Sequence, residues 1–237
     1  MGVLAVIGGH SILGVDFPAG AERRSIDTSH GEMTLLDAGE VIGVQRHGTD
    51  DYRTAPQINH RANLAALSEL GCDRVLAVGS TGGLRVELAV GTFVCPDDFI
   101  ALHLGTSYSH GHGGERVPGF DPDWREQVLR AWQSTTDIPI RPGGTYWQAI
   151  GPRFETPAEI RMISAHADVI GMTIAAECIL AGELGIRYAA VCVVDNLANG
   201  VGAAPLTLQE FEAGKERNRH RLLEALAAVV PELTSGP

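Results

Sequence analysis

Short apolar runs alternate along this chain with segments whose apolar residues recur at helical spacing, and this alternation limits the possible folds more than any other feature. Five runs have the length of a buried strand, at residues 3–7, 41–45, 75–78, 169–172 and 188–194. Helix-like segments follow Pro56, cover 122–133, begin near Ala175 and cover 206–230. The pattern predicts an α/β fold with three layers, a central mixed β-sheet flanked by helices. We expect one domain over residues 1–232 and a short C-terminal tail over 233–237.

The composition restricts the kinds of partner that the chain can have. Its net charge is −11 over 237 residues and no basic stripe is visible, so we expect no nucleic-acid surface. The apolar start is too short for a signal peptide and no run approaches transmembrane length, which predicts a cytoplasmic protein with no membrane partner. His110-Gly111-His112 lacks a nearby carboxylate or cysteine to complete a ligand set, so we expect a mobile glycine-rich loop over 104–118 and no metal site.

The stretch from residue 151 to residue 177 carries a helix-start signal with a carboxylate just before it. Thr156, Pro157 and Glu159 form a capping box with proline at the first helical position. Phe154 and Glu155 therefore lie on a loop in front of a helix N-terminus. A buried Glu155 at that place can accept a hydrogen bond from a ligand.

Three further motifs follow strand-like runs, and each has a structural alternative. The turn Gly8-Gly9-His10-Ser11 can present N–H groups to an anion, although it is neither a Walker A loop nor a dinucleotide fingerprint and can equally be a plain turn. Arg46-His47 at a strand end can bind an anion or form a surface ion pair. Asp195-Asn196 can belong to a site or to an ordinary turn.

The motifs are more specific in combination than singly. In chain order they are Gly8-Gly9, Arg46-His47-Gly48, Ile58-Asn59-His60-Arg61-Ala62-Asn63, Gly79-Ser80-Thr81-Gly82-Gly83-Leu84, Gly151-Pro152-Arg153-Phe154-Glu155-Thr156 and Gly171-Met172-Thr173. On these residues the chain resembles the trimeric purine nucleoside phosphorylases, and it is most similar to their methylthioadenosine and methylthioinosine phosphorylase branch. The similarity runs from about residue 3 to residue 230.

The resemblance implies a phosphorylase/hydrolase-like fold and a homotrimer. It also implies a pentosyltransferase (a glycosyltransferase) of purine salvage. Members of the family cleave a purine nucleoside with inorganic phosphate as co-substrate, giving the free base and ribose 1-phosphate, and need no cofactor. Such a site needs an anion cradle, a ribose pocket and a group that stabilises the departing base.

The resemblance also implies roles for single residues. Those expected to bind phosphate are Arg46, His47, Thr173, His10, Ser11 and Ser80. Arg46 suits this role because its guanidinium can bind phosphate through two N–H groups. Met172 is expected to pack on the ribose and Phe154 on the purine. Thr81 lies with Ser80 in a predicted loop beside both phosphate and nucleoside.

Glu155 and Asn196 are the expected catalytic pair, and they bear on the identity of the base. A 6-oxopurine carries a hydrogen on N1 and an acceptor at O6, and an ionised Glu155 accepts hydrogen bonds only, so it suits N1–H. Asn196 offers a donor for O6 and an acceptor for N7–H. The pair favours inosine- or guanosine-like substrates or their 5′-methylthio forms. A one-residue shift would instead place Asp195 against the base, as in adenine-preferring members of the family.

The chain departs from the family pattern on the phosphate side. His10 stands where a phosphate-binding hydroxyl is usual, and Asp51 stands where a histidine is expected. An ionised Asp51 about 4 Å from phosphate would cost from ~1 kcal/mol in water to ~4 kcal/mol at the dielectric of a protein surface. Three alternatives therefore stay open: a hydrolase that uses water in place of phosphate, a catalytically silent nucleoside-binding protein, and a nicotinamide-dependent oxidoreductase suggested only by the glycine-rich first turn.

Overall fold

The predicted strands form the centre of one mixed sheet. The computed structural model describes residues 2–109, 115–202 and 207–235. In these residues the sheet has eleven strands, with β2-β3-β4-β1-β5-β10-β9-β7 along its main path and with β11, β6 and β8 branching from β5. β1 is parallel to β4 and β5, and β5 is parallel to β11, whereas β10 runs antiparallel to β5. The sheet is therefore mixed, as the sequence predicts.

The elements have the following bounds. The strands are β1 Val3–Gly8, β2 Glu22–Thr28, β3 Gly31–Asp37, β4 Val41–Gln45, β5 Cys72–Gly83, β6 Phe93–Val94, β7 Asp98–Ile100, β8 Ile140–Arg141, β9 Thr145–Gln148, β10 Val169–Gly171 and β11 Arg187–Leu197. The helices are α1 His60–Glu69, α2 Pro122–Thr135, α3 Pro157–Ile163, α4 Ile174–Glu183 and α5 Leu208–Ser235, with short 3₁₀ turns at η1 His10–Ile12 and η2 Ala55–Gln57.

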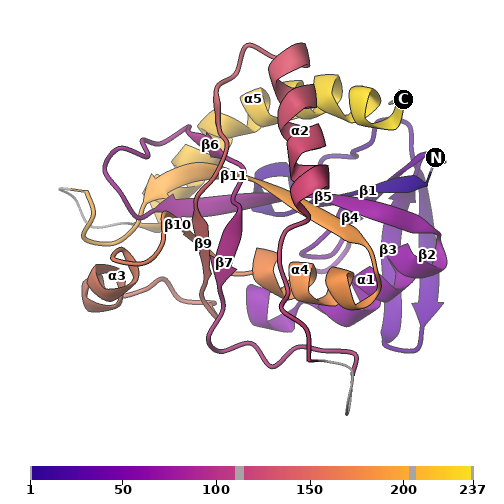
Figure 1. Cartoon of the computed structure of the whole chain (residues 1–237), viewed down its shortest axis with the longest axis horizontal. Coiled ribbons are helices and arrows are strands. Elements are labelled where there is room, and N and C mark those ends of the chain that lie inside the picture. The colour runs from indigo at the N-terminus through magenta and orange to yellow at the C-terminus, as the bar shows by residue number, and fades with distance from the viewer. Residues whose placement is uncertain (1, 110–114, 203–206, 236–237) are drawn as a thin grey trace.

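Helices cover both faces of the sheet, which explains the continuous apolar runs of the central strands. Along β1, Leu4 and Val6 point into the cluster beneath α2 and α5, whereas Ala5 and Ile7 point into the cluster beneath α1 and α4. Figure 1 shows α2 and α5 above the sheet and α1 and α4 below it, with α3 at the far end from the two termini. The three-layer α/β arrangement predicted from the alternation is confirmed.

The longest strand, β5, corrects one prediction. Residues 79–83, expected to form a loop, are the last part of β5 and pair with β11 and β10. Small residues permit this close pairing: a Cβ on Gly79 would lie 3.3 Å from the Ile174 side chain, and one on Gly82 would lie 3.1 Å from Ile170. Ser80 and Thr81 are therefore held on a strand between neighbours.

β11 also continues past its predicted end at residue 194 and contains a bulge. Val194 pairs with Thr81 and Asn196 pairs with Gly82, so Asp195 is the extra residue. Because of the bulge, two consecutive side chains point in different directions. Asn196 lines the cavity described below, and Asp195 does not.

The helix predictions hold with shifted ends. The capping box is present, with the Thr156 hydroxyl accepting from the Glu159 backbone N–H at 3.2 Å and the Glu159 carboxylate accepting from the Thr156 N–H at 2.7 Å. α5 runs to Ser235 instead of ending near residue 230, so it includes part of the segment predicted to be a tail. The helix continues because Leu233 is buried against the core.

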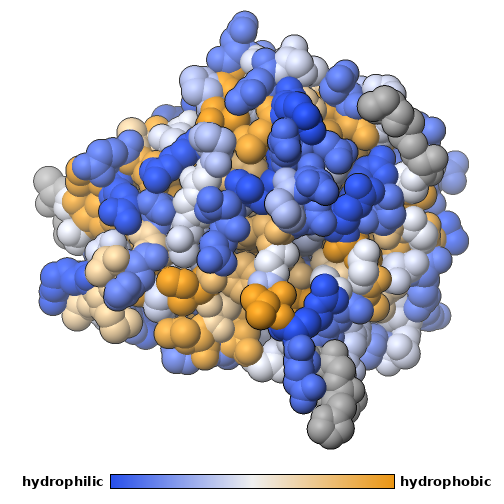
Figure 2. All heavy atoms as spheres, viewed as in Figure 1, coloured by the Kyte–Doolittle hydropathy of each residue, from blue (hydrophilic) through white to orange (hydrophobic). Residues whose placement is uncertain are grey.

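Three further observations concern membrane-spanning helices, metal-binding clusters and exposed apolar side chains. In the described part of the chain, no helix is long and apolar enough to cross a membrane. No group of three or more His, Cys, Asp or Glu side chains that could hold a metal ion is found among the same residues, and His110-Gly111-His112 lies outside them. Figure 2 shows hydrophobic atoms gathered on the lower part of one face, and the exposed apolar side chains of the molecule include Leu102, Val117 and Ile150.

Candidate active site

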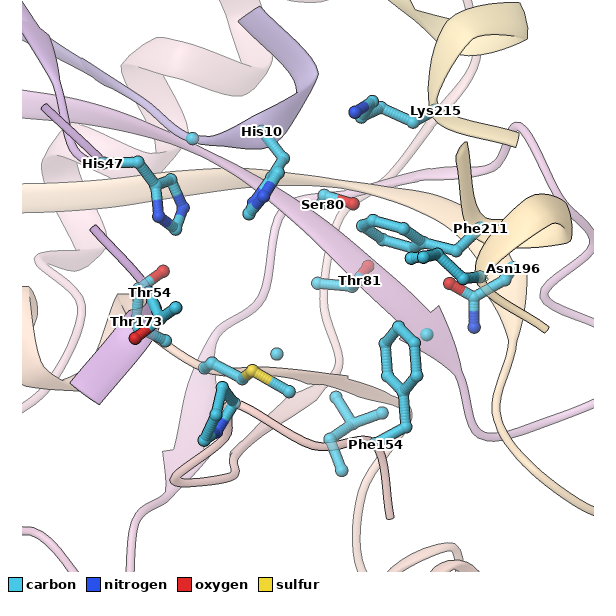
Figure 3. A pocket seen from close by; sticks show the side chains of 18 of the residues that line it. His10, His47, Thr54, Ser80, Thr81, Phe154, Thr173, Asn196, Phe211 and Lys215 are labelled. Atoms are coloured by element: carbon cyan, nitrogen blue, oxygen red, sulfur yellow. The ribbon is translucent and has the colours of Figure 1, made fainter. Parts of the chain in front are cut away.

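A cavity of about 470 Å³ lies where the segments after β1, β4 and β10 meet the last residues of β5 and β11. Ligand sites of α/β proteins commonly occur at such strand ends. Figure 3 shows His10 and His47 at one end, Phe154, Phe211 and Asn196 at the other, and Ser80 and Thr81 between them. The cavity brings together most of the predicted site residues: His10, Arg46, His47, Ser80, Thr81, Phe154, Glu155, Met172, Thr173 and Asn196.

The end with Phe154 and Asn196 keeps polar groups free for a ligand. The amide nitrogen of Asn196 donates to the Leu197 carbonyl at 2.9 Å, which leaves one N–H and the amide oxygen available. Glu155 is half-buried, and burial raises the pKa of its carboxyl above the ordinary 4.5, opposed by a hydrogen bond from its own backbone. The ring of Phe154 contacts Phe211 edge to face at a centroid distance of 5.5 Å. We call this part the base end, after the role that the family resemblance implies for Phe154 and Asn196.

Two glycines shape the space at the base end. A Cβ on Gly82 would lie 3.4 Å from the Asn196 amide nitrogen and so would intrude beside it. Gly151 has a φ of +70°, and a Cβ there would lie 2.5 Å from the sulfur of Met172. The loop that carries Phe154 therefore lies close against Met172, which lines the cavity.

The opposite end, which we call the phosphate end after the role that the resemblance implies for Arg46, rests on a buried ion pair. Arg46 Nε and Nη2 donate to the two carboxylate oxygens of Glu177 at 2.5 and 2.7 Å, and Nη1 donates to the Val78 carbonyl at 2.8 Å. Tyr188 donates to the same carboxylate at 2.7 Å. Burial favours the neutral forms, but the mutual charges outweigh it, so the pKa of Arg46 is raised and that of Glu177 is lowered to about 2. Arg46 lies at the cavity wall with its charge already compensated.

Three aromatic side chains pack around this end. His10 lies 4.2 Å from His47 between ring centroids, and Tyr52 stacks on His47 at 5.3 Å with its hydroxyl 2.7 Å from His10 Nε2. Burial, together with the charge of Lys215, lowers the pKa of His10. Burial and the neighbouring His10 lower the pKa of His47 to about 3, and its Nδ1 contacts the Arg53 carbonyl at 2.8 Å. Both histidines are therefore neutral at pH 7.

Thr173 occupies the N-cap position of α4 but does not cap the helix with its hydroxyl. The backbone N–H groups of Thr173 and Ile174 donate to the Tyr146 hydroxyl at 3.2 and 3.4 Å, and that of Ala176 donates to Gln148 at 3.0 Å. Buried side chains thus accept hydrogen bonds from the first backbone N–H groups of the helix in place of the Thr173 hydroxyl. Thr173 itself lines the cavity.

A second buried network lies behind the cavity and includes three predicted site residues, Ser11, Ser80 and Asp195. The carboxylate of Asp195 accepts from Ser80 at 2.5 Å, from Ser11 at 3.5 Å and from Asn218 at 2.8 Å. Burial raises the pKa of Asp195 despite these hydrogen bonds. Neither Ser11 nor Asp195 lines the cavity. Ser80 does, but its hydroxyl hydrogen is engaged, so it offers a ligand only a lone pair.

Comparison with known proteins identifies the family. A family model described as the phosphorylase superfamily matches residues 3–231. This chain belongs to the phosphorylase superfamily. A protein of Archaeoglobus fulgidus named a probable 6-oxopurine nucleoside phosphorylase is 34% identical over 236 residues, which cover 98% of this chain and 97% of that protein. The 6-oxopurine nucleoside phosphorylase of Pyrococcus furiosus is 32% identical, over 96% of this chain and 92% of its own length.

The fold of this phosphorylase-superfamily chain agrees with a solved member. The methylthioadenosine phosphorylase from Schistosoma mansoni in complex with adenine superposes with a TM-score of 0.87 over 100% of this chain and 93% of that chain, at 22% identity. The resemblance to purine nucleoside and methylthioadenosine phosphorylases predicted from the motifs is therefore confirmed.

The structure corrects three expectations about which residues face the cavity. Ser11 and Asp195 are not in the cavity wall, because the turn at η1 and the bulge in β11 direct them at each other and at α5. Asp51 does not line this cavity; it lines a second, polar cavity to which Arg46 also contributes, so its carboxylate is not in the wall of the phosphate end. The Thr81 hydroxyl lines the site but donates to the Val193 carbonyl at 3.0 Å.

Several site residues escaped the sequence reasoning. Tyr52, Thr54, Leu208, Phe211, Glu212 and Lys215 also line the cavity. The resemblance implies that the helix over 206–230 covers the substrate end of the site, but its single residues carry no local signal, because their part in the site depends on where the helix packs. Glu177 is different: a glutamate within the apolar run of α4 signals a buried charge that needs a partner.

Proposed function

We propose that this chain is a purine nucleoside phosphorylase that acts on 6-oxopurine nucleosides or their 5′-methylthio forms, with inorganic phosphate as co-substrate. The observation that carries the proposal is the joint presence in one cavity of Glu155, Asn196 and the hydroxyl of Thr173, with Arg46 at the wall. Relatives named as 6-oxopurine and methylthioinosine phosphorylases support it.

In the proposed reaction a phosphate oxygen forms a bond to the anomeric carbon as the bond from that carbon to purine N9 breaks. The electron pair of the broken bond leaves with the base, which takes up a proton from solvent at N7. The products are the free base and a ribose 1-phosphate. Asn196 stabilises the departing base by accepting from N7–H and donating to O6.

Glu155 selects the base in this proposal. Its carboxylate accepts a hydrogen bond from N1–H of a 6-oxopurine, whereas adenine presents a lone pair at N1 and would face the carboxylate unpaired. Phe154 stacks on the purine and Met172 packs on the ribose. Thr173 and the remaining N–H groups of Arg46 bind phosphate, and His10 binds it as a neutral donor. Neutral His47 uses its one ring N–H, on Nδ1, for the Arg53 carbonyl, so it borders the anion without donating to it, against the prediction from the sequence.

The phosphate requirement is the test of this function. Inosine, methylthioinosine and methylthioadenosine are incubated with the protein, with and without phosphate, and release of the base is followed by absorbance. We expect release of hypoxanthine that needs phosphate and slower reaction with the 6-amino substrate. Phosphate-independent release would replace the proposal with a hydrolase, and ligand-induced thermal stabilisation without turnover would replace it with a nucleoside-binding protein.

We further propose a homotrimer in the cytoplasm, as the family resemblance implies. The exposed apolar side chains of Leu102, Val117 and Ile150 support a surface that another subunit covers. Light scattering coupled to gel filtration tests the assembly, with three times 25.1 kDa as the expected mass. A monomer at catalytic concentrations would contradict it.

A further inference from the structure

Helix α5 is held against the cavity by two close contacts with β11. A Cβ on Gly214 would lie 1.8 Å from the carbonyl oxygen of Asp195, so only glycine allows the helix to approach so closely. One turn later Asn218 donates to the Asp195 carboxylate at 2.8 Å and to the Val194 carbonyl at 3.2 Å. Lys215 directly follows Gly214 and is therefore fixed at the cavity edge, where its side chain lines the cavity and is 15% exposed.

The phosphate end lacks an uncompensated positive charge for an anion. Arg46 is paired with Glu177 through Nε and Nη2, and His10 and His47 are neutral at pH 7. A phosphate ion that carries one or two negative charges would thus enter a site whose arginine is already neutralised. Lys215 is the other cation among the cavity-lining residues.

The two cations differ in how easily they can be released to a ligand. The side chains of Arg46 and Glu177 are 1% and 0% exposed, and separating them would leave a charge unpaired in the interior. Lys215 is paired with Glu212, one turn earlier on the same helix, and the Glu212 side chain is 49% exposed. Because the Glu212 carboxylate keeps its access to water when the pair separates, this pair opens more readily than the buried pair of Arg46 and Glu177.

We propose that Lys215 is the phosphate-binding cation of this site and turns from Glu212 to the phosphate ion when it enters. Figure 3 shows Lys215 reaching from α5 over the side of the cavity that holds His10 and Ser80. Its ammonium lies 5.9 Å from the centre of the Phe211 ring, and the ring of His10 lies 6.0 Å from the same ring, so Lys215 and His10 border Phe211 together. The charge of Lys215 also lowers the pKa of His10, which agrees with this placement. The proposal rests on the proposed function for the identity of the anion.

The first experiment separates phosphate binding from nucleoside binding. Lys215→Met is compared with Lys215→Arg and with Arg217→Met, which removes the same charge from an exposed position of α5 outside the cavity. We expect Lys215→Met to raise the KM for phosphate by about 10- to 100-fold with the nucleoside KM changed less than about twofold, and Lys215→Arg to restore most of the loss. Equal effects of Lys215→Met and Arg217→Met, or equal changes in both KM values, would overturn the proposal.

A second variant makes the test independent of the folding of Lys215→Met. Glu212→Gln removes the competing carboxylate and keeps the lysine, so we expect the phosphate KM to fall by about two- to fivefold. An unchanged or raised phosphate KM in Glu212→Gln would contradict release of Lys215 from this pair.

Direct binding of inorganic phosphate distinguishes failure of this proposal from failure of the proposed function. Thermal midpoints are measured with phosphate and with sodium chloride at matched ionic strength. If phosphate stabilises the wild type and Arg217→Met but not Lys215→Met, Lys215 binds phosphate even in a protein that releases no base. If the wild type is phosphorolytic and Lys215→Met retains both the stabilisation and the phosphate KM, the function stands and the role of Lys215 is refuted.

Discussion

The two ends of the cavity are built in opposite ways. At the base end Phe154 is 36% exposed, Glu155 is half-buried, and Asn196 keeps an N–H and an oxygen for a ligand. At the phosphate end Arg46 and Glu177 are buried and bonded to each other, and Ser80 is bonded to a buried carboxylate. The base end therefore has polar groups without partners in the protein, whereas most polar groups of the phosphate end are hydrogen-bonded within the protein.

The difference shows what each end can do for a reaction. Fixed dipoles that are held by the protein need little reorganisation when charge develops, and this suits the end where we propose that phosphate binds and attacks. Polar groups that are left free provide discrimination, because a ligand that fails to satisfy them leaves them unpaired. We therefore expect changes at the phosphate end to affect stability first and changes at the base end to affect substrate choice first.

The largest effect is expected from Glu177→Gln. This change leaves Arg46 without its counter-charge in the interior, which should lower the free energy of unfolding at pH 7 by about 3–5 kcal/mol. The folded pKa of Glu177 is about 2, below the ordinary 4.5, so its stabilisation is present above pH 4.5 and is lost as the pH falls toward 2. Urea unfolding measured between pH 3 and pH 7 checks both the loss and the flatter pH dependence of the variant.

A matched control for this prediction is Glu126→Gln, which breaks the exposed Glu126–Arg130 pair on α2. Its unfolding curve should coincide with that of the wild type. Similar destabilisation in both variants would mean that the buried pair has no special part in the fold.

A smaller effect, on specificity, is expected from Glu155→Gln at the base end. Losing a hydrogen bond to a charged acceptor should lower kcat/KM for inosine by about 10- to 100-fold. The glutamine amide can donate to the N1 lone pair of adenine, so kcat/KM for adenosine should fall less or rise. The ratio of the two values is the measurement, and an unchanged ratio would remove Glu155 from base recognition.

The smallest effect is expected in the pH dependence of kcat/KM for inosine. This dependence distinguishes titration of Glu155 at the base end from titration of the histidines at the phosphate end. Glu155 must be ionised to accept from N1–H, and burial raises its pKa above 4.5, so kcat/KM for inosine should fall on the acid side with an apparent pKa above that value. His47, with a pKa of about 3, and His10, whose pKa is also lowered, should add no limb near 6.5. A limb near 6.5 that survives Glu155→Gln and disappears in His47→Gln would reverse this assignment.

The sequence predicts the base end better than the phosphate end, for a physical reason. Phe154 and Glu155 precede a helix whose capping box is local, so their loop can be placed from neighbouring residues alone. The separation of Asp195 from Asn196 depends on a bulge that only the pairing of β11 with β5 reveals. The glycines around Ser80 predict a loop, although these residues form a strand. They are needed because other elements pack closely against them, and neighbouring residues in the sequence do not show such packing.

The residues on α5 illustrate the limit most clearly. Amphipathic spacing predicts the helix, but Lys215 enters the site only because Gly214 and Asn218 fix the helix on Asp195. The role of Glu177 can be predicted in part from the sequence. Its burial can be inferred from the apolar run of α4, whereas its partner Arg46 is 131 residues away in sequence and is identified only in the folded chain.

Phosphate is the nucleophile in the proposed reaction, and one measurement tests this directly. Phosphorus NMR of a reaction with inosine and inorganic phosphate should show a sugar 1-phosphate ester appearing in a one-to-one ratio with the hypoxanthine released. Hypoxanthine released together with free ribose, while the phosphate signal stays unchanged, would contradict the account.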